Sequence, residues 1–197
     1  MSEVIVDTLK HSGNSSTANV TLASNGNVSV AGALSAGSFT GAGLFSSYAI
    51  IAERKSSGSA GGDVTANTWT ARALNTEIAD PDGIVTLSSN QFTLGAGSYL
   101  IKWRSPAHRV QAFNTALYNV TDSSYAGYGE SSYSYNSDGS TVYGEGKARV
   151  TISGSKAFEI RIMIEASCGA DSTGRSNNMS NYSAEETYTT AEIYKEA

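Results

Sequence analysis

The stretch Phe92-Thr-Leu-Gly-Ala-Gly-Ser-Tyr-Leu-Ile-Lys-Trp-Arg104 contains a strand end, a glycine-rich turn and an alternating strand within thirteen residues. Tyr99, Ile101 and Trp103 fall on one face of that strand, and the residues between them fall on the other. A period of two is typical of an antiparallel strand with one buried face. The segment Phe158–Ala166 repeats the pattern, with Phe158, Ile160, Ile162, Ile164 and Ala166 predicted inside and Glu159, Arg161 and Glu165 outside.

Further segments of this kind follow one another beyond residue 47, separated by turns such as Asp80-Pro-Asp-Gly83 and Asn136-Ser-Asp-Gly139. This spacing, without helical periodicity, predicts an all-β head over residues 48–197, built as a two-sheet antiparallel sandwich. The other predicted strands are Tyr48–Lys55, Thr68–Leu74, Ile84–Leu87, an edge at Phe92, Tyr99–Arg104, Gln111–Val120, Thr141–Tyr143, Ala148–Ser153 and Thr187–Tyr194.

The composition excludes several classes of protein. A net charge of -5 and the lack of a Lys/Arg cluster argue against nucleic-acid binding. No apolar run is long enough for a membrane helix, and no secretory leader is evident, so we expect no membrane insertion and synthesis in a cytosol. Cys168 is the single cysteine and cannot form an internal disulfide, so we expect a small structural residue there.

No set of residues predicts catalysis. The only histidines are His11 and His108, and the arginines flanking His108 oppose its protonation, which disfavours a catalytic base. The segment Gly144-Glu-Gly-Lys147 lacks the spacing of a phosphate loop. Asp80 and Asp82 are weak candidates for Ca²⁺ ligands, although their motif is first of all a turn. We therefore expect no enzyme, cofactor or metal; a glycan depolymerase would need a matched carboxylate pair, and none can be singled out.

Residues 1–47 have a different composition, with Glu3, Asp7 and Lys10 as their only charged side chains. Short apolar alternations over Val4–Leu9, Ala18–Leu22 and Asn27–Val30 predict an extended β stem. Such a segment cannot bury enough apolar area alone, so three copies wound side by side would stabilise it. A flexible Ser/Gly-rich tail is the alternative, which the regular apolar spacing disfavours.

Two resemblances add to this interpretation. The order Trp69, Asn75, Phe92 and Gly97-Ser-Tyr99 resembles the C1q/TNF-like jelly roll over roughly residues 48–197, although Phe92 lies one residue closer to Gly97 than in animal C1q proteins. The resemblance implies a parallel homotrimer. The segment VTLASNGNVSVAGALSAGSFTGAG and the opening VIVDTLKHSG resemble the stems of marine phage fibres. They imply a virion location, with the N-terminus bound to a tail adaptor or another virion protein.

We therefore expect a tail fibre whose trimeric head attaches to a host-surface glycan or protein. Val4, Ile5 and Val6 would anchor it by adding a strand to a sheet edge of the adaptor. A head (capsid) fibre or decoration protein without a receptor role, and a free C1q/TNF-like binding module, are the alternatives.

Receptor contact is expected in two polar, aromatic regions. The first is the loop Ser167–Glu186, which pairing of the first and last strands would carry away from the stem. The second is a run of tyrosines among Gly, Ser and Asn, a composition typical of adaptable binding surfaces. Packing between strands, or against a trimer axis, is the alternative explanation of these tyrosines. The candidate residues are Arg175, Asn177, Asn178, Asn181, Tyr182, Tyr125, Tyr128, Tyr133 and Tyr135.

Overall fold

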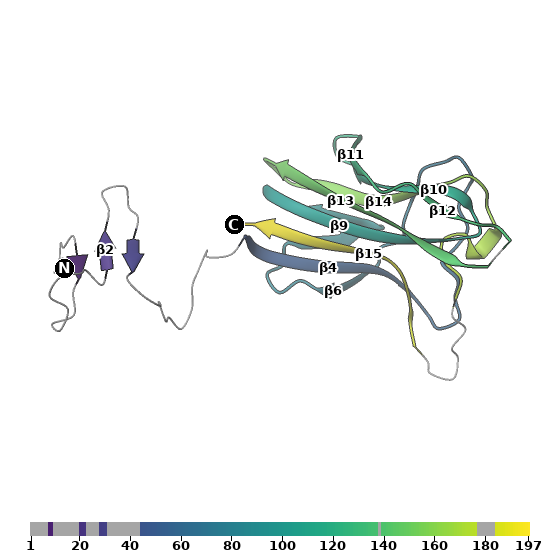
Figure 1. Ribbon diagram of the computed structural model, residues 1–197, viewed down its shortest axis with the longest axis horizontal. Helices are drawn as coiled ribbons and strands as arrows, with labels where there is room; N and C mark the ends of the chain where they lie inside the picture. The colour runs from purple at the N-terminus through teal and green to yellow at the C-terminus, as the bar shows by residue number, and fades with distance from the viewer. Residues whose placement is uncertain (1–7, 10–19, 23–27, 31–43, 138, 177–183) are drawn as a thin grey trace. The chain divides into compact units, whose positions relative to one another are not determined.

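The computed structural model describes residues 8–9, 20–22, 28–30, 44–137, 139–176 and 184–197 (Figure 1). The chain divides into two compact units, Met1–Ala42 and Gly43–Ala197. Within the described residues, helical structure is limited to the 3₁₀ turn η1 (Gly169–Asp171), and no helix there could cross a membrane.

The N-terminal unit contains three short antiparallel strands, β1 (Thr8–Leu9), β2 (Val20–Leu22) and β3 (Val28–Val30). Val20 is paired with Val30 and Leu22 with Val28, so the alternating apolar positions are cross-strand neighbours within one chain. The predicted anchor residues Val4, Ile5 and Val6 lie outside the described residues.

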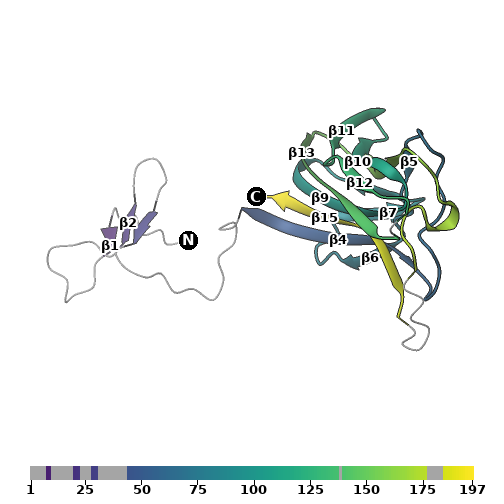
Figure 2. The same cartoon turned by 45° about the vertical axis from the view of Figure 1, so that its right-hand side comes forward.

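The second unit, which we call the head, consists of two antiparallel sheets (Figures 1 and 2). One sheet has the order β13-β9-β15-β4-β6, and the other has the order β11-β10-β14-β8-β7, with β12 paired to β10 and β5 paired to β14. This is the predicted two-sheet jelly-roll sandwich. The strands are β4 (Phe45–Lys55), β5 (Thr70–Ala71), β6 (Thr76–Ala79), β7 (Val85–Ser88), β8 (Gln91–Leu94), β9 (Gly97–His108), β10 (Gln111–Asn119), β11 (Ser124–Tyr128), β12 (Ser132–Ser134), β13 (Thr141–Ile152), β14 (Lys156–Ile164) and β15 (Glu186–Glu196).

The core lies between the sheets and comes from the alternating positions that the sequence indicated. Tyr99, Ile101 and Trp103 of β9 are buried, whereas Lys102 and Arg104, which alternate with them, are exposed. They pack in one cluster with residues of both sheets, and a smaller cluster near the far end of β9 includes Phe113 and Ile164. The members of the larger cluster are Ala49, Ile51, Leu74, Val85, Phe92, Leu94, Tyr99, Ile101, Trp103, Leu117, Ile152, Phe158, Ile160, Ala191 and Ile193.

Several predicted segments differ from the observed strands, and the largest difference, in β13, has a physical reason. The segments Thr141–Tyr143 and Ala148–Ser153 belong to the single strand β13, because Gly144 and Gly146 lie within it rather than in a turn. A Cβ on Gly146 would lie 2.1 Å from Cζ2 of Trp103, so this glycine makes room for the indole ring. The segment Thr68–Leu74 is a strand only at β5, and β14 ends at Ile164, before Ala166. Strands β6, β11 and β12 were not predicted.

The first and last strands of the head, β4 and β15, are antiparallel neighbours, as expected. Glu186 is paired with Lys55, so the chain segments that follow β4 and precede β15 lie at one end of the sandwich. We call this the loop end. It is opposite to the end at which β4 begins at Phe45 and β15 finishes at Glu196.

Candidate functional site

Four aromatic rings gather on the solvent face of the β11-β10-β14 sheet. The ring centroids of Trp69 and Tyr125 are 5.4 Å apart, and those of Trp69 and Tyr128 are 6.0 Å apart. Tyr125 stacks on Tyr128 at 5.1 Å and meets Tyr118 edge-on at 4.9 Å. We call Trp69, Tyr118, Tyr125 and Tyr128 the aromatic platform.

Strand pairing explains why these rings meet. Tyr118 of β10 is paired with Tyr125 of β11, and Tyr128 is paired with Ala116. On the other side of β14, Ala71 of β5 is paired with Arg161, which holds Trp69, two residues before Ala71, next to the tyrosines of the platform. Ala116 is fully buried although it points to this face, because the surrounding side chains cover it.

Arg161 completes the platform from β14. Its guanidinium lies 3.4 Å from the ring centroid of Tyr118 and forms an ion pair with Glu159. Burial alone would lower the pKa of Arg161, but its hydrogen bonds and charge interactions with Glu159 and Tyr125 together outweigh burial, so the pKa is raised. Glu159 lies on the outer face of β14, as predicted, but it is buried there rather than exposed to solvent, and its carboxylate accepts a hydrogen bond from Arg161.

The platform is accessible to a ligand. Tyr128 is 58% exposed, and Trp69, Tyr118 and Tyr125 are half-buried. Cross-strand packing accounts for the Tyr118–Tyr125 pair. It does not account for the exposed Tyr128 ring, or for Trp69, which comes from a segment more than forty residues before β10. Flat, partly exposed rings with hydroxyls at their edges suit the C–H faces and hydroxyl groups of sugar rings.

The structure separates the predicted receptor residues into groups. Tyr125 and Tyr128 belong to the platform, whereas Tyr133 and Tyr135 form a second pair, 6.0 Å apart, on and just after β12. Arg175 is exposed at the loop end, close enough to His108 to affect its protonation. The other candidates, Asn177, Asn178, Asn181 and Tyr182, lie outside the described residues.

Sequence reasoning missed Trp69 and Arg161 as members of the site. Arg161 was assigned to a solvated face by its alternation with isoleucines, and nothing nearby in the sequence marks it as a stacking partner. The signal that could have found Trp69 is its own position: a tryptophan beside Thr68 and Thr70, in a segment with few other apolar residues to bury it.

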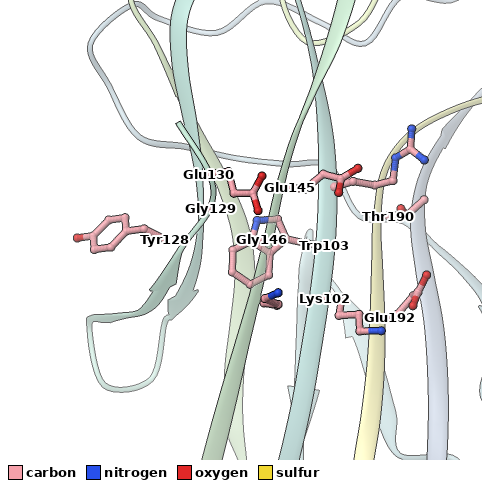
Figure 3. A pocket seen from close by; sticks show the side chains of 11 residues that line it. Lys102, Trp103, Tyr128, Gly129, Glu130, Glu145, Gly146, Thr190 and Glu192 are labelled. Carbon is pink, nitrogen blue, oxygen red and sulfur yellow. The ribbon is translucent and has the colours of Figure 1, made fainter. Parts of the chain in front are cut away.

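A separate hollow of about 590 Å³ lies beside β13 (Figure 3). Trp103 contributes its indole next to Gly146, while the Tyr128 ring is directed away from it. Trp103 is only 4% exposed and donates its Nε1–H to Thr115 Oγ1 at 2.9 Å, so the indole is committed to the core. Charged groups of both signs, including Lys102, Glu145 and Glu192, form the rest of the lining. This hollow therefore offers mixed charge rather than an aromatic surface.

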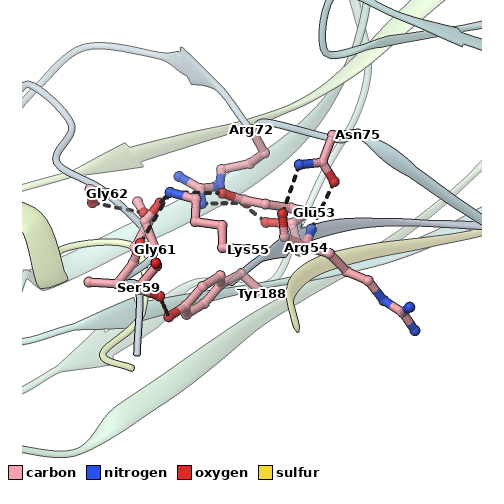
Figure 4. A network of polar contacts seen from close by, with 12 residues as sticks. Glu53, Arg54, Lys55, Ser59, Gly61, Gly62, Arg72, Asn75 and Tyr188 are labelled. Atoms are coloured by element: carbon pink, nitrogen blue, oxygen red, sulfur yellow. Dashed lines mark hydrogen bonds and ion pairs between the residues drawn. The ribbon is translucent and has the colours of Figure 1, made fainter. Parts of the chain in front are cut away.

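A buried polar network supports the loop end (Figure 4). Arg72 and Glu53 form an ion pair with both side chains almost fully buried. Lys55 donates from Nζ to the carbonyl oxygens of Ala60 and Gly61, and Tyr188 donates its hydroxyl to the carbonyl of Ser59. Burial is the main cause that raises the pKa of Tyr188 well above its ordinary value, so the hydroxyl stays a donor. The network therefore fixes the segment between β4 and β5, residues 56–69, against β15.

The described residues offer little for catalysis or metal binding. His108 is buried and its pKa is lowered, chiefly by desolvation and further by Arg175 and Arg109, against an opposing effect of Asp171. Cys168 donates its thiol to the carbonyl of His108. Within the part of the chain that the structure describes, no three His, Cys, Asp or Glu residues cluster as metal ligands.

The two weak metal candidates are occupied by local contacts. Asp80 accepts hydrogen bonds from the N–H groups of Ile84 and Val85, both at 2.8 Å, and Asp82 accepts one from Ser47. These contacts are those of a turn that is fastened to β7 and β4.

Comparison with known proteins identifies the fold. No protein-family model matches the chain, and no curated protein sequence matches it. Among solved structures, Eiger TNF from S. frugiperda aligns with a TM-score of 0.50 and 12% identity over 76% of this chain and 92% of that chain. Murine APRIL at pH 5.0 gives 0.49 and 8% over 76% and 98%, and the globular domain of zebrafish complement 1qA gives 0.45 and 12% over 76% and 96%. The Eiger TNF alignment, together with the order of strands in the two sheets, shows that the head has the C1q/TNF-like jelly-roll fold.

Proposed function

We propose that this chain is a virion fibre protein of a phage, and that its head attaches the particle to carbohydrate on the host surface through the aromatic platform. The observation that carries the binding role is the platform itself. Rings from three separate segments meet on one solvent face, and Tyr128 is left more than half exposed. The sequence resemblance of the stem to phage fibres supports the virion location, with Val4, Ile5 and Val6 as the anchor.

Self-association into a trimer belongs to the same proposal. The β13-β9-β15-β4-β6 sheet, which does not carry the platform, has large apolar side chains on its solvent face. Phe45 is 40% exposed, Tyr48 44% and Tyr143 39%. Phe45 also packs on Tyr194 at 5.1 Å, and Lys102 lies over the same ring. Association through this face would bury these groups while leaving the platform free. A trimer would present three platforms, one on each head, and avidity would then strengthen a weak single contact.

The binding role can be tested with the full-length protein on an array of neutral and charged glycans. The variant Trp69→Ala should lose binding, because it removes the ring from one side of the platform, whereas Trp69→Phe should retain part of it. Thr86→Ala is the matched control, since Thr86 is exposed on β7 of the same sheet but away from the platform. Equal binding by Trp69→Ala and Thr86→Ala would refute the platform as the site.

The virion location needs a separate measurement. Antibody-labelled particles viewed by electron microscopy should carry the protein on fibres, with the head outward. A variant without residues 1–12 should fold and assemble but no longer be found on particles. A head that fails to fold after this deletion would contradict the separate roles proposed for the two units.

A further inference from the structure

The solvent face of β10 and β14 continues the platform toward the loop end in regular rows. Tyr128, Ala116 and Arg161 form one row, and Asn114 pairs with Met163 in the next. Beyond these, Ala112 is paired with Tyr133 of β12 on one side and accepts a hydrogen bond from the Glu165 N–H on the other. Residues that are directly opposed in an antiparallel sheet share a face. The exposed Tyr133 ring therefore stands on the same face as the platform.

A hollow of about 370 Å³ occupies the space between these two aromatic regions. It lies where the segment between β11 and β12 turns from β10 toward β13, since the Gly129 N–H donates to the Thr115 carbonyl and the next residue, Glu130, donates to the Glu145 carbonyl. Met163, an apolar residue between the polar outward residues Arg161 and Glu165, lies in its wall. The polar part of the lining is Asn67, Asn114, Ser131, Ser132 and Glu165.

The charges along this surface are engaged by the protein itself. Arg161 is paired with Glu159, and Glu165 accepts a hydrogen bond from the Ala112 N–H through Oε2 at 3.1 Å. Asn114 accepts from the Thr115 N–H with Oδ1, which leaves its amide NH₂ as a donor. On this surface the cation Arg161 is already paired with Glu159, and the exposed Glu165 adds a negative charge. A surface of flat rings, amides and hydroxyls with this charge pattern favours a neutral ligand rich in hydroxyl groups over an anionic one.

From these contacts we propose that the platform, the hollow and the Tyr133–Tyr135 pair form one continuous groove that binds an extended, neutral glycan chain. The inference rests on the proposed function, because it assigns the ligand class and length to the same face. The groove follows β10 from Tyr118 to Ala112, which is about 20 Å at roughly 3.3 Å per residue. A single sugar ring contacts only one row of such a surface, so affinity depends on the length of the chain.

A length series of linear neutral oligosaccharides, from disaccharide to hexasaccharide, tests this with the full-length protein by titration calorimetry. We expect wild-type affinity to rise by about tenfold between the disaccharide and the longer members, as one more aromatic region is reached. Tyr133→Ala and Asn114→Ala should remove that gain, so that each variant binds the hexasaccharide no more tightly than it binds the disaccharide. Trp69→Ala should weaken all members, and Thr86→Ala should weaken none.

The outcomes separate the two proposals. Binding that does not depend on length, or that Tyr133→Ala and Asn114→Ala both leave intact, overturns the groove while the platform stands as the site. Sulfated or carboxylated chains that bind more tightly than neutral ones overturn the ligand class. Absence of binding for every oligosaccharide, charged or neutral, refutes the proposed function and the groove with it.

Discussion

Replacing Arg72 should destabilise the head severely, because this residue is the partner of a buried carboxylate. Arg72 is 3% exposed and Glu53 is 0% exposed, and Arg72 also donates Nε–H to Thr189 Oγ1 at 3.1 Å. Among the described residues, the second carboxylate oxygen of Glu53 has no hydrogen-bond partner, and Lys55 Nζ lies 3.8 Å from it. Arg72→Met leaves this charge in the interior without its main partner, which costs about 3–5 kcal/mol of unfolding free energy.

The assay is urea unfolding of the full-length protein, followed by tryptophan fluorescence. For a head of this size, the expected loss corresponds to a fall in melting temperature of about 6–20 °C. The double variant Arg72→Met with Glu53→Met should regain most of the loss, because no buried charge is then left unpartnered. A loss below about 1 kcal/mol in Arg72→Met, or a double variant whose loss equals the sum of the two single losses, would refute this account of the network.

Three further predictions concern packing, pH and assembly. Gly146→Ala should lower the free energy of unfolding by about 1–3 kcal/mol, because the added Cβ would meet the Trp103 ring. Gly154→Ala is the control: no heavy atom lies within 4 Å of a Cβ at that position, so the same unfolding assay should show almost no change. The pKa of His108 is lower in the folded head than its value of about 6.5 in the unfolded chain, so the unfolded chain takes up a proton first and stability should fall as pH drops from 7 toward about 5.5. His108→Gln should flatten this pH dependence in thermal melts. An unchanged pH dependence would refute the assignment of the effect to His108. Light scattering should give three times 20.5 kDa for the wild type and a smaller mass for Tyr48→Glu; a monomeric wild type at micromolar concentration would contradict the trimer.

The fold could be predicted where the sequence alternates strictly. Strands β9 and β14 follow their apolar positions almost residue by residue, since each buries one face against the other sheet. Strand β13 could not be predicted as one element, because Gly144 and Gly146 look like a break when read locally. The explanation lies in the tertiary structure, because a glycine is required at residue 146, where the Trp103 ring of β9 approaches the β13 backbone.

The candidate site was predictable only in its local part. Tyr125 and Tyr128 stand out because they lie in a short tyrosine-rich run. Trp69 and Arg161 join them through the pairing of β5 with β14, which connects residues some ninety positions apart. The burial of Glu159 also depends on long-range pairing. Alternation places Glu159 on the solvent face, and the Tyr118 ring and the Arg161 guanidinium beside it cover its side chain. Long-range strand pairing therefore brings Trp69 and Arg161 to the two tyrosines, and no local sequence pattern indicates this.

The central claim, that the aromatic platform contacts sugar, can be tested most directly by fluorine NMR. The chain has two tryptophans, so uniform 5-fluorotryptophan labelling gives one signal from the platform and one from the buried Trp103, which serves as an internal control. Trp69→Phe assigns the signals. On titration with a linear neutral hexasaccharide, the Trp69 signal should move in a saturable way while the Trp103 signal stays in place. A Trp69 signal that does not move, or a change confined to Trp103, would contradict the account.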